Sequence, residues 1–563
     1  MPGNSVNNAK TLDAKAGGET QNVEKEFFIS VFFDGTSNKM ETNTQQDIAE
    51  QTRSKANQTN KSAKVGTGAV AEGPKLNLKT SQLKQKDTNV AALSTLVENQ
   101  LVNANGKKKY YYHTYIEGPG TTYDGGKKDK GWYEELKAMP AEKASSIIGM
   151  AVGAWSQGVI AKVARGVSDV HRFLNNHTSK NERITTKVHF CVFGFSRGAA
   201  CARLFAYLVA RAADNNNTIT FESDFKDYLD GPARQLYTDR LHFLDEYQKQ
   251  NRLVEYLGIY DTVSSIGLID EDGSSNNGEL EVSDFLVHHN LNASQYGLFS
   301  PQLKNVKHTF HICAIDEYRK NFAITDVGKS VPSTCIEAFV PGCHSDVGGS
   351  YEDNLDSTGC LKTKLNDKPT MMAMKHPVHP EGGTGEVNLE NLMTLGWAVE
   401  KGFLEGIGES LTSNFTYSRN PTINWIQDTI SFKRTVKRGL SNITMKMMWQ
   451  RVNDDIAQAW GRELFVEYRQ LSDFVVPSEL NSYANLMDSS KLSYGKRHWL
   501  LPGESLSSAS YNWLRSRYIH FSASDRAGIS LVNGPNWKEN LLCRIVYHGD
   551  RNDSGIYYIQ DYA

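Results

Sequence analysis

Short apolar runs alternate with amphipathic or small-residue stretches along the first two thirds of the chain. Six of these runs have the length and the content of branched and aromatic residues that are typical of buried strands. They are Phe27–Phe33, Tyr110–Ile116, Val188–Phe193, Leu253–Tyr260, Thr309–Ile315 and Cys335–Val340. Helical patterns lie between them, beginning near Thr88 and covering Ala141–Asn176 and Arg197–Ala212. This alternation predicts an α/β fold, with a mostly parallel sheet and helices on both of its faces.

The same pattern divides the chain into regions. Residues 1–25 are polar and are predicted to be a disordered leader. Residues 26–364 carry all six strand patterns and form the expected main domain, in which the polar stretch 40–86 is a surface insertion. In residues 365–563 the pattern is weaker, with helices expected near 390–408 and 442–470. We expect this last region to be an accessory domain, a cap over the active face or a membrane-docking region.

Composition narrows the classes of function. The 563 residues include 62 Lys and Arg against 64 Asp and Glu, and the resulting net charge of -2 argues against nucleic acid as the main partner. The seven cysteines are scattered without metal-ligand spacing, which indicates synthesis in a reducing compartment rather than a disulfide framework. The leader has no apolar core of the kind that secretory signals contain, so export would need a route that ignores signal peptides.

One pentapeptide carries recognisable chemistry. Gly194-Phe195-Ser196-Arg197-Gly198 follows an apolar strand pattern and precedes a helix rich in small residues. Glycines on both sides allow a tight turn that lifts the serine hydroxyl above the sheet, as in the nucleophile elbow of α/β-hydrolases. The sequence therefore predicts a serine esterase of the α/β-hydrolase type with Ser196 as nucleophile. The amide of Arg197, at the start of the helix, is a candidate oxyanion donor.

A serine nucleophile needs a histidine base and an acid, which follow the serine in that fold in the order acid, histidine. His344 lies in a Gly-rich stretch directly after a strand pattern and is the first candidate base, while His520, in an apolar run near the C-terminus, is its rival. Three carboxylates are candidates for the acid: Asp261, Asp316 and Asp346. Asp316 follows the later of the two strand patterns that end in an aspartate, although Arg319 lies close enough to form an ion pair with it. The local pattern leaves the choice open.

Six motifs occur in an order that resembles one bacterial family. They are Phe32-Phe33-Asp34-Gly35-Thr36-Ser37-Asn38, Asp87-Thr88-Asn89-Val90, Glu117-Gly118-Pro119-Gly120-Thr121, Gly194-Phe195-Ser196-Arg197-Gly198-Ala199, Tyr260-Asp261-Thr262-Val263 and Pro341-Gly342-Cys343-His344-Ser345-Asp346-Val347-Gly348-Gly349. This set spans roughly residues 27–351 and resembles the catalytic domain of the group-one lipase effectors of bacterial type VI secretion. Pro119 departs from the small apolar residue more typical there, and the 40–86 insertion is unusually long.

The resemblance implies a phospholipase A toxin that is delivered into rival bacteria and uses a triad of Ser196, Asp261 and His344. It implies a secretion spike protein as carrier and a periplasmic immunity protein as inhibitor. The toxin would be made in the cytoplasm of the producer and would attack membrane phospholipid from the periplasm of the target cell.

The expected reaction is acyl transfer without a metal or an organic cofactor. The oxyanion would form against the Arg197 amide and an amide of the Gly35–Thr36 turn. Two alternatives remain open at this point: an esterase of soluble substrates, and a catalytically inactive binding protein with a hydrolase fold. The basic stretch Phe432–Arg438 and the apolar residues after it form either a membrane-docking surface or a solvated turn followed by a core helix. Those apolar residues are Ile443, Met445, Met447, Met448 and Trp449.

Overall fold

The computed structural model describes sixteen stretches of the chain. They are residues 24–36, 87–104, 107–119, 159–210, 246–248, 251–264, 306–318, 322–328, 330–351, 416–419, 428–431, 436–466, 474–500, 507–520, 543–547 and 556–560. The expected leader up to residue 23, the insertion at 40–86 and the helix near 390–408 lie outside the described residues.

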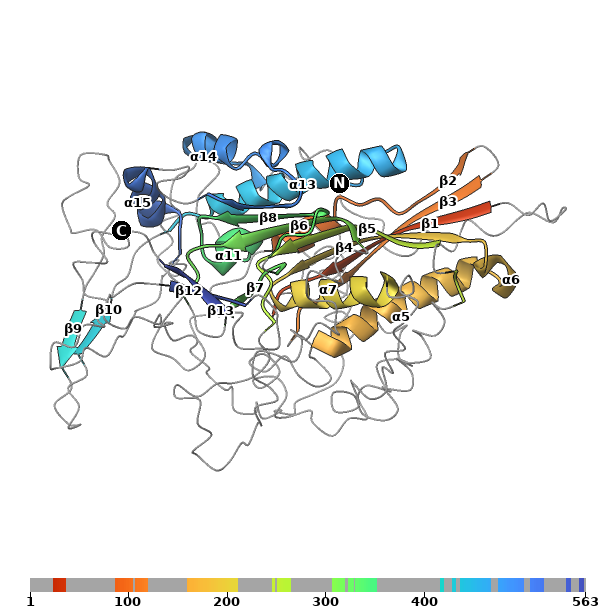
Figure 1. The fold of residues 1–563 in the computed structure, drawn as a ribbon, viewed down its shortest axis with the longest axis horizontal. Helices are drawn as coiled ribbons and strands as arrows, with labels where there is room; N and C mark the ends of the chain where they lie inside the picture. Colours follow the sequence, from red (N-terminus) through yellow and green to blue (C-terminus); the bar gives the residue numbers. More distant parts are fainter. Residues whose placement is uncertain are drawn as a thin grey trace, which may run out of the picture.

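An eight-stranded sheet forms the centre of the molecule (Figure 1), in the spatial order β11-β8-β6-β5-β4-β1-β3-β2. Its strands are β1 (Glu24–Phe33), β2 (Gln100–Ala104), β3 (Lys107–Ile116), β4 (Lys187–Phe195), β5 (Arg252–Tyr260), β6 (Val306–Ala314), β8 (Cys335–Val340) and β11 (Lys496–Trp499). Neighbouring strands pair in parallel, except that β2 runs antiparallel to β3 at one edge. Each of the six predicted strands overlaps an observed one, so the predicted α/β fold with a mostly parallel sheet is confirmed.

Helices cover both faces of this sheet. One face carries α5 (Val159–His177) and α7 (Arg197–Ala210), and the other carries α2 (Asn89–Ser94), α13 (Gly439–Trp460), α14 (Asn481–Leu486) and α15 (Ser508–Arg517). In β1 the odd-numbered apolar residues such as Phe27 pack with α5 and α7, whereas the even-numbered Phe28 and Phe32 pack on the opposite face. A strand buried on both faces is apolar at nearly every position, which explains why Ser30 is the single polar residue of the run Phe27–Phe33.

Helix α13 belongs to the core. Its Ile443, Met445, Met447 and Met448 are at most 2 % exposed. Met448 packs against the sheet at Gly258 of β5, where an added Cβ would lie 2.8 Å from its sulfur. The membrane-docking interpretation is therefore wrong for these four side chains, because they are already covered, and the core-helix interpretation holds. Residues 432–435 of the basic stretch lie outside the described residues.

Smaller elements complete the described structure. Three short strands form a second sheet in the order β13 (Ile556–Gln560), β12 (Cys543–Tyr547), β7 (Ile324–Thr325), while β9 (Thr416–Arg419) and β10 (Asp428–Ser431) pair as a separate ribbon. Helix α6 (Lys180–Arg183), helix α11 (His344–Gly348) and two 3-10 turns, η12 (Ser478–Leu480) and η13 (Ser489–Lys491), are single turns. Among the described helices, none combines the length and the apolar content that crossing a membrane requires.

Candidate active site

Ser196 lies in a sharp turn between strand β4 and helix α7. Its φ of +60° is in the left-handed region, which non-glycine residues rarely adopt. The turn is fixed by its own backbone, since the Ser196 amide donates to the Tyr260 carbonyl at 3.0 Å and its carbonyl accepts from the amides of Ala199 at 3.0 Å and Val263 at 3.2 Å. This is the strained strand–turn–helix geometry that the pentapeptide predicts.

The flanking glycines are required by close backbone contacts. A Cβ on Gly194 would lie 2.4 Å from the carbonyl oxygen of Gly198, so the strand and the helix could not approach as they do. A Cβ on Gly198 would lie 2.2 Å from the carbonyl oxygen of Asp34. The second contact brings the Gly35–Thr36 turn, which follows β1, next to the serine turn.

Asp261 and His344 are hydrogen-bonded to each other at the carboxyl ends of their strands. Asp261 directly follows β5 with a φ of +43°, and His344 begins α11 shortly after β8. The ring Nδ1–H of His344 donates to Asp261 Oδ2 at 2.5 Å, and both side chains are buried. The His344 ring centroid also lies 4.5 Å from that of Phe195, the neighbour of Ser196 in the chain. Helix α11 approaches this closely because Gly348, opposite the Phe195 ring, has no Cβ.

The Asp261 carboxylate has two further partners. Its Oδ1 accepts the amide of Ala314 at 2.8 Å, and its Oδ2 also accepts from the guanidinium of Arg544 at 2.8 Å. Burial raises the pKa of Asp261, but the charge of Arg544 and the hydrogen bond from His344 outweigh it and hold the pKa well below its usual range. The carboxylate is therefore ionised at neutral pH and can accept the hydrogen bond from the His344 ring.

Arg544 is a residue of this site that the sequence analysis missed. The available signal is a single charge inside the apolar run Leu541–Tyr547, because a charged residue in a buried strand usually has a specific partner.

The rival acids hold the turn that precedes His344. Asp316 accepts from the amide of Gly342 at 2.8 Å, the hydroxyl of Tyr511 at 2.8 Å and the guanidinium of Arg515 at 3.1 Å. Among the described residues its charged partner is Arg515 of α15. Arg319, the partner that the sequence suggested, lies outside the described residues.

His520 and Asp346 are paired with each other. His520 Nδ1 lies 2.6 Å from Asp346 Oδ1, while Asp346 Oδ2 accepts from the amides of His520 at 2.8 Å and Cys343 at 3.0 Å. The rival base thus contacts a rival acid. Asp316 precedes His344 in the chain and Asp346 follows it. Both aspartates accept amides of the turn before His344, and each also binds a residue of the C-terminal region.

The side chain of Asp34 stabilises the Gly35–Thr36 turn through hydrogen bonds. Its Oδ1 accepts from the Gly35 amide and the Thr88 hydroxyl, each at 2.7 Å, and its Oδ2 accepts from the Tyr115 hydroxyl at 2.5 Å. Burial raises the pKa of Asp34 to about 6 in spite of these bonds. The Arg197 side chain reaches the same turn and donates to the Thr36 hydroxyl at 3.1 Å. Three of the sequence motifs therefore meet at one turn beside Ser196.

Asn89, from the same motif as Thr88, ties that motif to α11 and α13. Its side-chain amide donates to the carbonyls of Val347 and Ser441, each at 3.0 Å, and to the hydroxyl of Thr444 at 3.1 Å. A Cβ added to Gly349 would lie 2.8 Å from the backbone nitrogen of Asn89, so this close approach needs a glycine. This asparagine fixes the far end of the helix that His344 begins.

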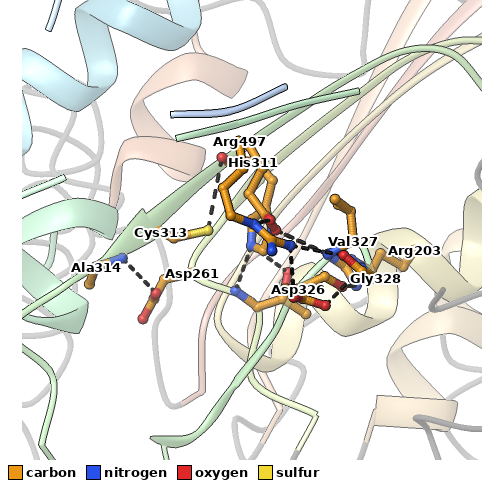
Figure 2. A network of polar contacts seen from close by, with 11 residues as sticks. Arg203, Asp261, His311, Cys313, Ala314, Asp326, Val327, Gly328 and Arg497 are labelled. Atoms are coloured by element: carbon orange, nitrogen blue, oxygen red, sulfur yellow. Dashed lines mark hydrogen bonds and ion pairs between the residues drawn. The ribbon is translucent and has the colours of Figure 1, made fainter. Parts of the chain in front are cut away.

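A buried network of charges supports Thr262, the neighbour of Asp261 (Figure 2). His311 Nε2 accepts from the Thr262 amide at 3.2 Å, and its Nδ1 lies 2.9 Å from Glu337. Arg497 of β11 binds the other oxygen of Glu337 at 2.6 Å and Asp326 at 2.8 Å. The contacts of Arg497 could not be predicted from the sequence, because β11 is short and polar.

His311, Cys313 and Glu337 of this network have potential metal-binding atoms within 4.8 Å of one another. Two arginines already supply positive charge at this cluster. The charge of Arg497 acts on Glu337, and that of the buried Arg203 acts on His311. We therefore interpret the cluster as a structural ion network.

Comparisons with known proteins identify the family. The family model described as "T6SS, Phospholipase effector Tle1-like, catalytic domain" matches residues 28–374. Among solved structures, a Tle1 effector bound to the VgrG spike of the type 6 secretion system is 19% identical, with a TM-score of 0.46, over 97% of this chain and 95% of that one. An uncharacterized protein from Pseudomonas aeruginosa is 15% identical, with a TM-score of 0.31, over 83% of this chain and 50% of that one. No curated protein matches. Because the model covers more than half of its length, the chain belongs to the family of type VI secretion phospholipase effectors with a Tle1-like catalytic domain.

Proposed function

We propose that the protein is a serine-dependent phospholipase A in which Ser196, Asp261 and His344 are nucleophile, acid and base. The observation that carries the proposal is the buried 2.5 Å hydrogen bond between His344 Nδ1 and an ionised Asp261. Tyr260, which precedes Asp261, accepts the amide of Ser196, and this serine is held at φ +60°. An aspartate on Nδ1 leaves Nε2 as the basic nitrogen and stabilises the imidazolium that forms during the reaction.

The reaction has two halves. In the first, His344 Nε2 accepts the Ser196 hydroxyl proton while Oγ attacks an acyl ester carbon of a phospholipid. The tetrahedral intermediate collapses, the ester C–O bond breaks, and His344 returns the proton to the leaving lysophospholipid oxygen. In the second half, His344 deprotonates a water that attacks the acyl-serine, which releases a fatty acid and restores the serine hydroxyl.

The oxyanion requires donors beside Ser196. The Arg197 amide at the first position of α7 is one, as expected for a nucleophile elbow. For the second we propose the Thr36 amide rather than that of Gly35, because the Gly35 amide is engaged by Asp34 at 2.7 Å. Each such donor typically contributes about a hundred- to a thousandfold in rate.

The biological setting follows from the family. We propose that the protein is an antibacterial effector carried by a secretion spike protein, which acts on phospholipid from the periplasm of the target cell. The producer is then protected by a periplasmic immunity protein. The similar Tle1 effector is bound to the VgrG spike, which supports a spike as carrier.

The decisive test compares the wild type with Ser196→Ala on phospholipid vesicles and on soluble short-chain esters. We expect the wild type to release fatty acid from vesicles, and the folded variant to lose activity by several orders of magnitude because the attacking group is gone. Activity within about tenfold of wild type in the variant would refute the nucleophile. Hydrolysis of short-chain esters alone would replace the lipase with an esterase of soluble substrates, and no hydrolysis of either would leave a binding protein.

A further inference from the structure

We propose that Arg544 is a positioning residue of the hydrolytic site, which fixes the Asp261 carboxylate and sets the pH range in which His344 acts as a base. The inference rests on the proposed function of the Asp261–His344 pair. It gives β12 a role in the hydrolytic site through Arg544, which lies 283 residues after Asp261 in the sequence.

The guanidinium of Arg544 closes a ring of contacts around the carboxylate. One Nη donates to Asp261 Oδ2 at 2.8 Å and to the Phe322 carbonyl at 3.0 Å, and the other donates to the Ala314 carbonyl. The amide of that same Ala314 donates to Asp261 Oδ1 at 2.8 Å. The planar fork of an arginine can satisfy these acceptors together, which a lysine cannot. The rotation of the Asp261 carboxylate is therefore fixed at both oxygens.

Strand β12 is attached to the segment that follows Asp261. Val546 and Tyr547 of β12 pair with Ile324 and Thr325 of β7, and Ile324 forms a bridge with Val263. Val546 is also fully buried in an apolar cluster with Ile324. The arginine and the aspartate are thus parts of one small structure, so that the position of one determines the position of the other.

Arg544 and His344 share a single oxygen, Asp261 Oδ2. A cation on this oxygen draws carboxylate charge away from the histidine and adds positive charge beside it. Both effects disfavour the imidazolium. Other charged or titratable groups also face the pair: the Glu317 carboxylate accepts the His344 amide at 3.2 Å, His311 and Cys313 lie on β6 beside Asp261, and Asp346, paired with His520, lies two residues after His344. Within the part of the chain that the structure describes, Arg544 is the cation that touches the acid directly.

Arg544→Met should therefore move the acid limb of the pH profile of kcat/KM to higher pH. His344 must be neutral to accept a proton, and without the guanidinium it stays protonated up to a higher pH. A neighbouring charge typically shifts a titration by about one pH unit or more. We also expect kcat/KM on the plateau to fall roughly tenfold to a hundredfold, less than the ~10⁴-fold loss when the acid itself is replaced.

Two further variants separate charge from geometry. Arg544→Lys keeps the charge but not the fork, so we expect an acid limb within about 0.3 pH units of the wild type and a reduced plateau. Arg451→Met is the control, because it removes a partly buried arginine paired with Asp455 at 3.0 Å on α13, away from Asp261. It should lower thermal stability comparably while leaving the acid limb unchanged. Circular dichroism checks that every variant folds.

The titration of His344 should also be followed directly, by NMR of protein with ¹⁵N-labelled histidine, using His344→Gln to assign its signals. This measurement needs no substrate, so it separates the role of Arg544 from the proposed function. If the wild type hydrolyses nothing but the His344 titration still moves upward in Arg544→Met, the proposed function fails and the electrostatic role stands. If folded Arg544→Met shows neither a shifted acid limb of kcat/KM nor a shifted His344 titration, the inference is overturned, whatever the plateau rate. If Arg544→Met does not fold, an upward shift in Arg544→Lys, or an undiminished plateau there, overturns it.

Discussion

At the scale of single residues, the structure makes the choice between acids testable. Asp261→Asn should lower kcat up to about ten-thousandfold, because an asparagine at this place favours the wrong histidine tautomer. Asp316→Asn should instead lower the thermal midpoint, since it weakens the ion pair with Arg515 and the bond to Gly342. We expect the second variant to keep kcat within about tenfold at low temperature. Ester hydrolysis and thermal unfolding of both variants check this, and a crippled but fully stable Asp316→Asn would make Asp316 the acid.

The sequence could indicate the nucleophile but could not choose the acid. Ser196 is marked by a local pattern, since the glycines and the flanking strand and helix lie within a few residues. Asp261, Asp316 and Asp346 each follow or lie near a strand end, so local sequence treats them alike. Their partners differ because Arg515 and His520 lie 199 and 174 residues away from the aspartates they bind. Such pairings are a property of the folded chain, and the triad itself stays a prediction until the variants are measured.

At the scale of elements, the contact between α7 and the end of β1 should control the oxyanion turn. Gly198→Ala puts a methyl group 2.2 Å from the backbone oxygen of Asp34, which cannot move without displacing the Gly35–Thr36 turn. We expect a loss of kcat of about a hundredfold or more, as when one oxyanion donor is removed. Gly461→Ala is the comparison: it lies beyond the end of α13 at φ +68°, with nothing within 4 Å. It should cost about 1 kcal/mol of stability from backbone strain alone and leave kcat unchanged. Equal kcat values for both variants would contradict this assignment.

Periodicity predicted the elements that are long and apolar, and it missed those that are short and polar. All six predicted strands are present, and Cys335–Val340 has the predicted bounds. Strand β11, Lys496–Trp499, was missed because three of its four residues are charged or polar, and it pairs only at the edge of the sheet. The stretch after His344 was expected to be a Gly-rich loop, but it forms one helical turn, α11, whose first-turn carboxylate Asp346 caps the Cys343 amide.

At the scale of the whole molecule, we predict that the harm done by the protein depends on the compartment. The chain should be expressed in a bacterium without an immunity protein, once in the cytoplasm and once behind a periplasmic export signal. The exported form should be toxic and the cytoplasmic form much less so, and Ser196→Ala should abolish toxicity in both. Survival curves with matched expression levels measure the effect. Toxicity of exported Ser196→Ala would show that the harm has a source other than the proposed chemistry.

The C-terminal region contributes directly to the core and to the candidate site. β11 extends the central sheet, α13 covers one of its faces, and Arg515, His520 and Arg544 contact the aspartates around His344. No motif marks this region in the sequence, because isolated basic residues in a weak pattern resemble ordinary surface residues. The division into domains at residue 364 stays a prediction.

The hydrogen bonds of Asn89 have a consequence for folding during synthesis on the ribosome. This buried amide finds its acceptors 258 to 355 residues later in the chain, at Val347, Ser441 and Thr444. At about 5–20 residues per second, roughly 20 to 70 seconds pass between the synthesis of Asn89 and that of Thr444. Until α13 has been made, every strand synthesised so far lacks the cover of this helix on that face, and chaperones can bind the nascent apolar surface.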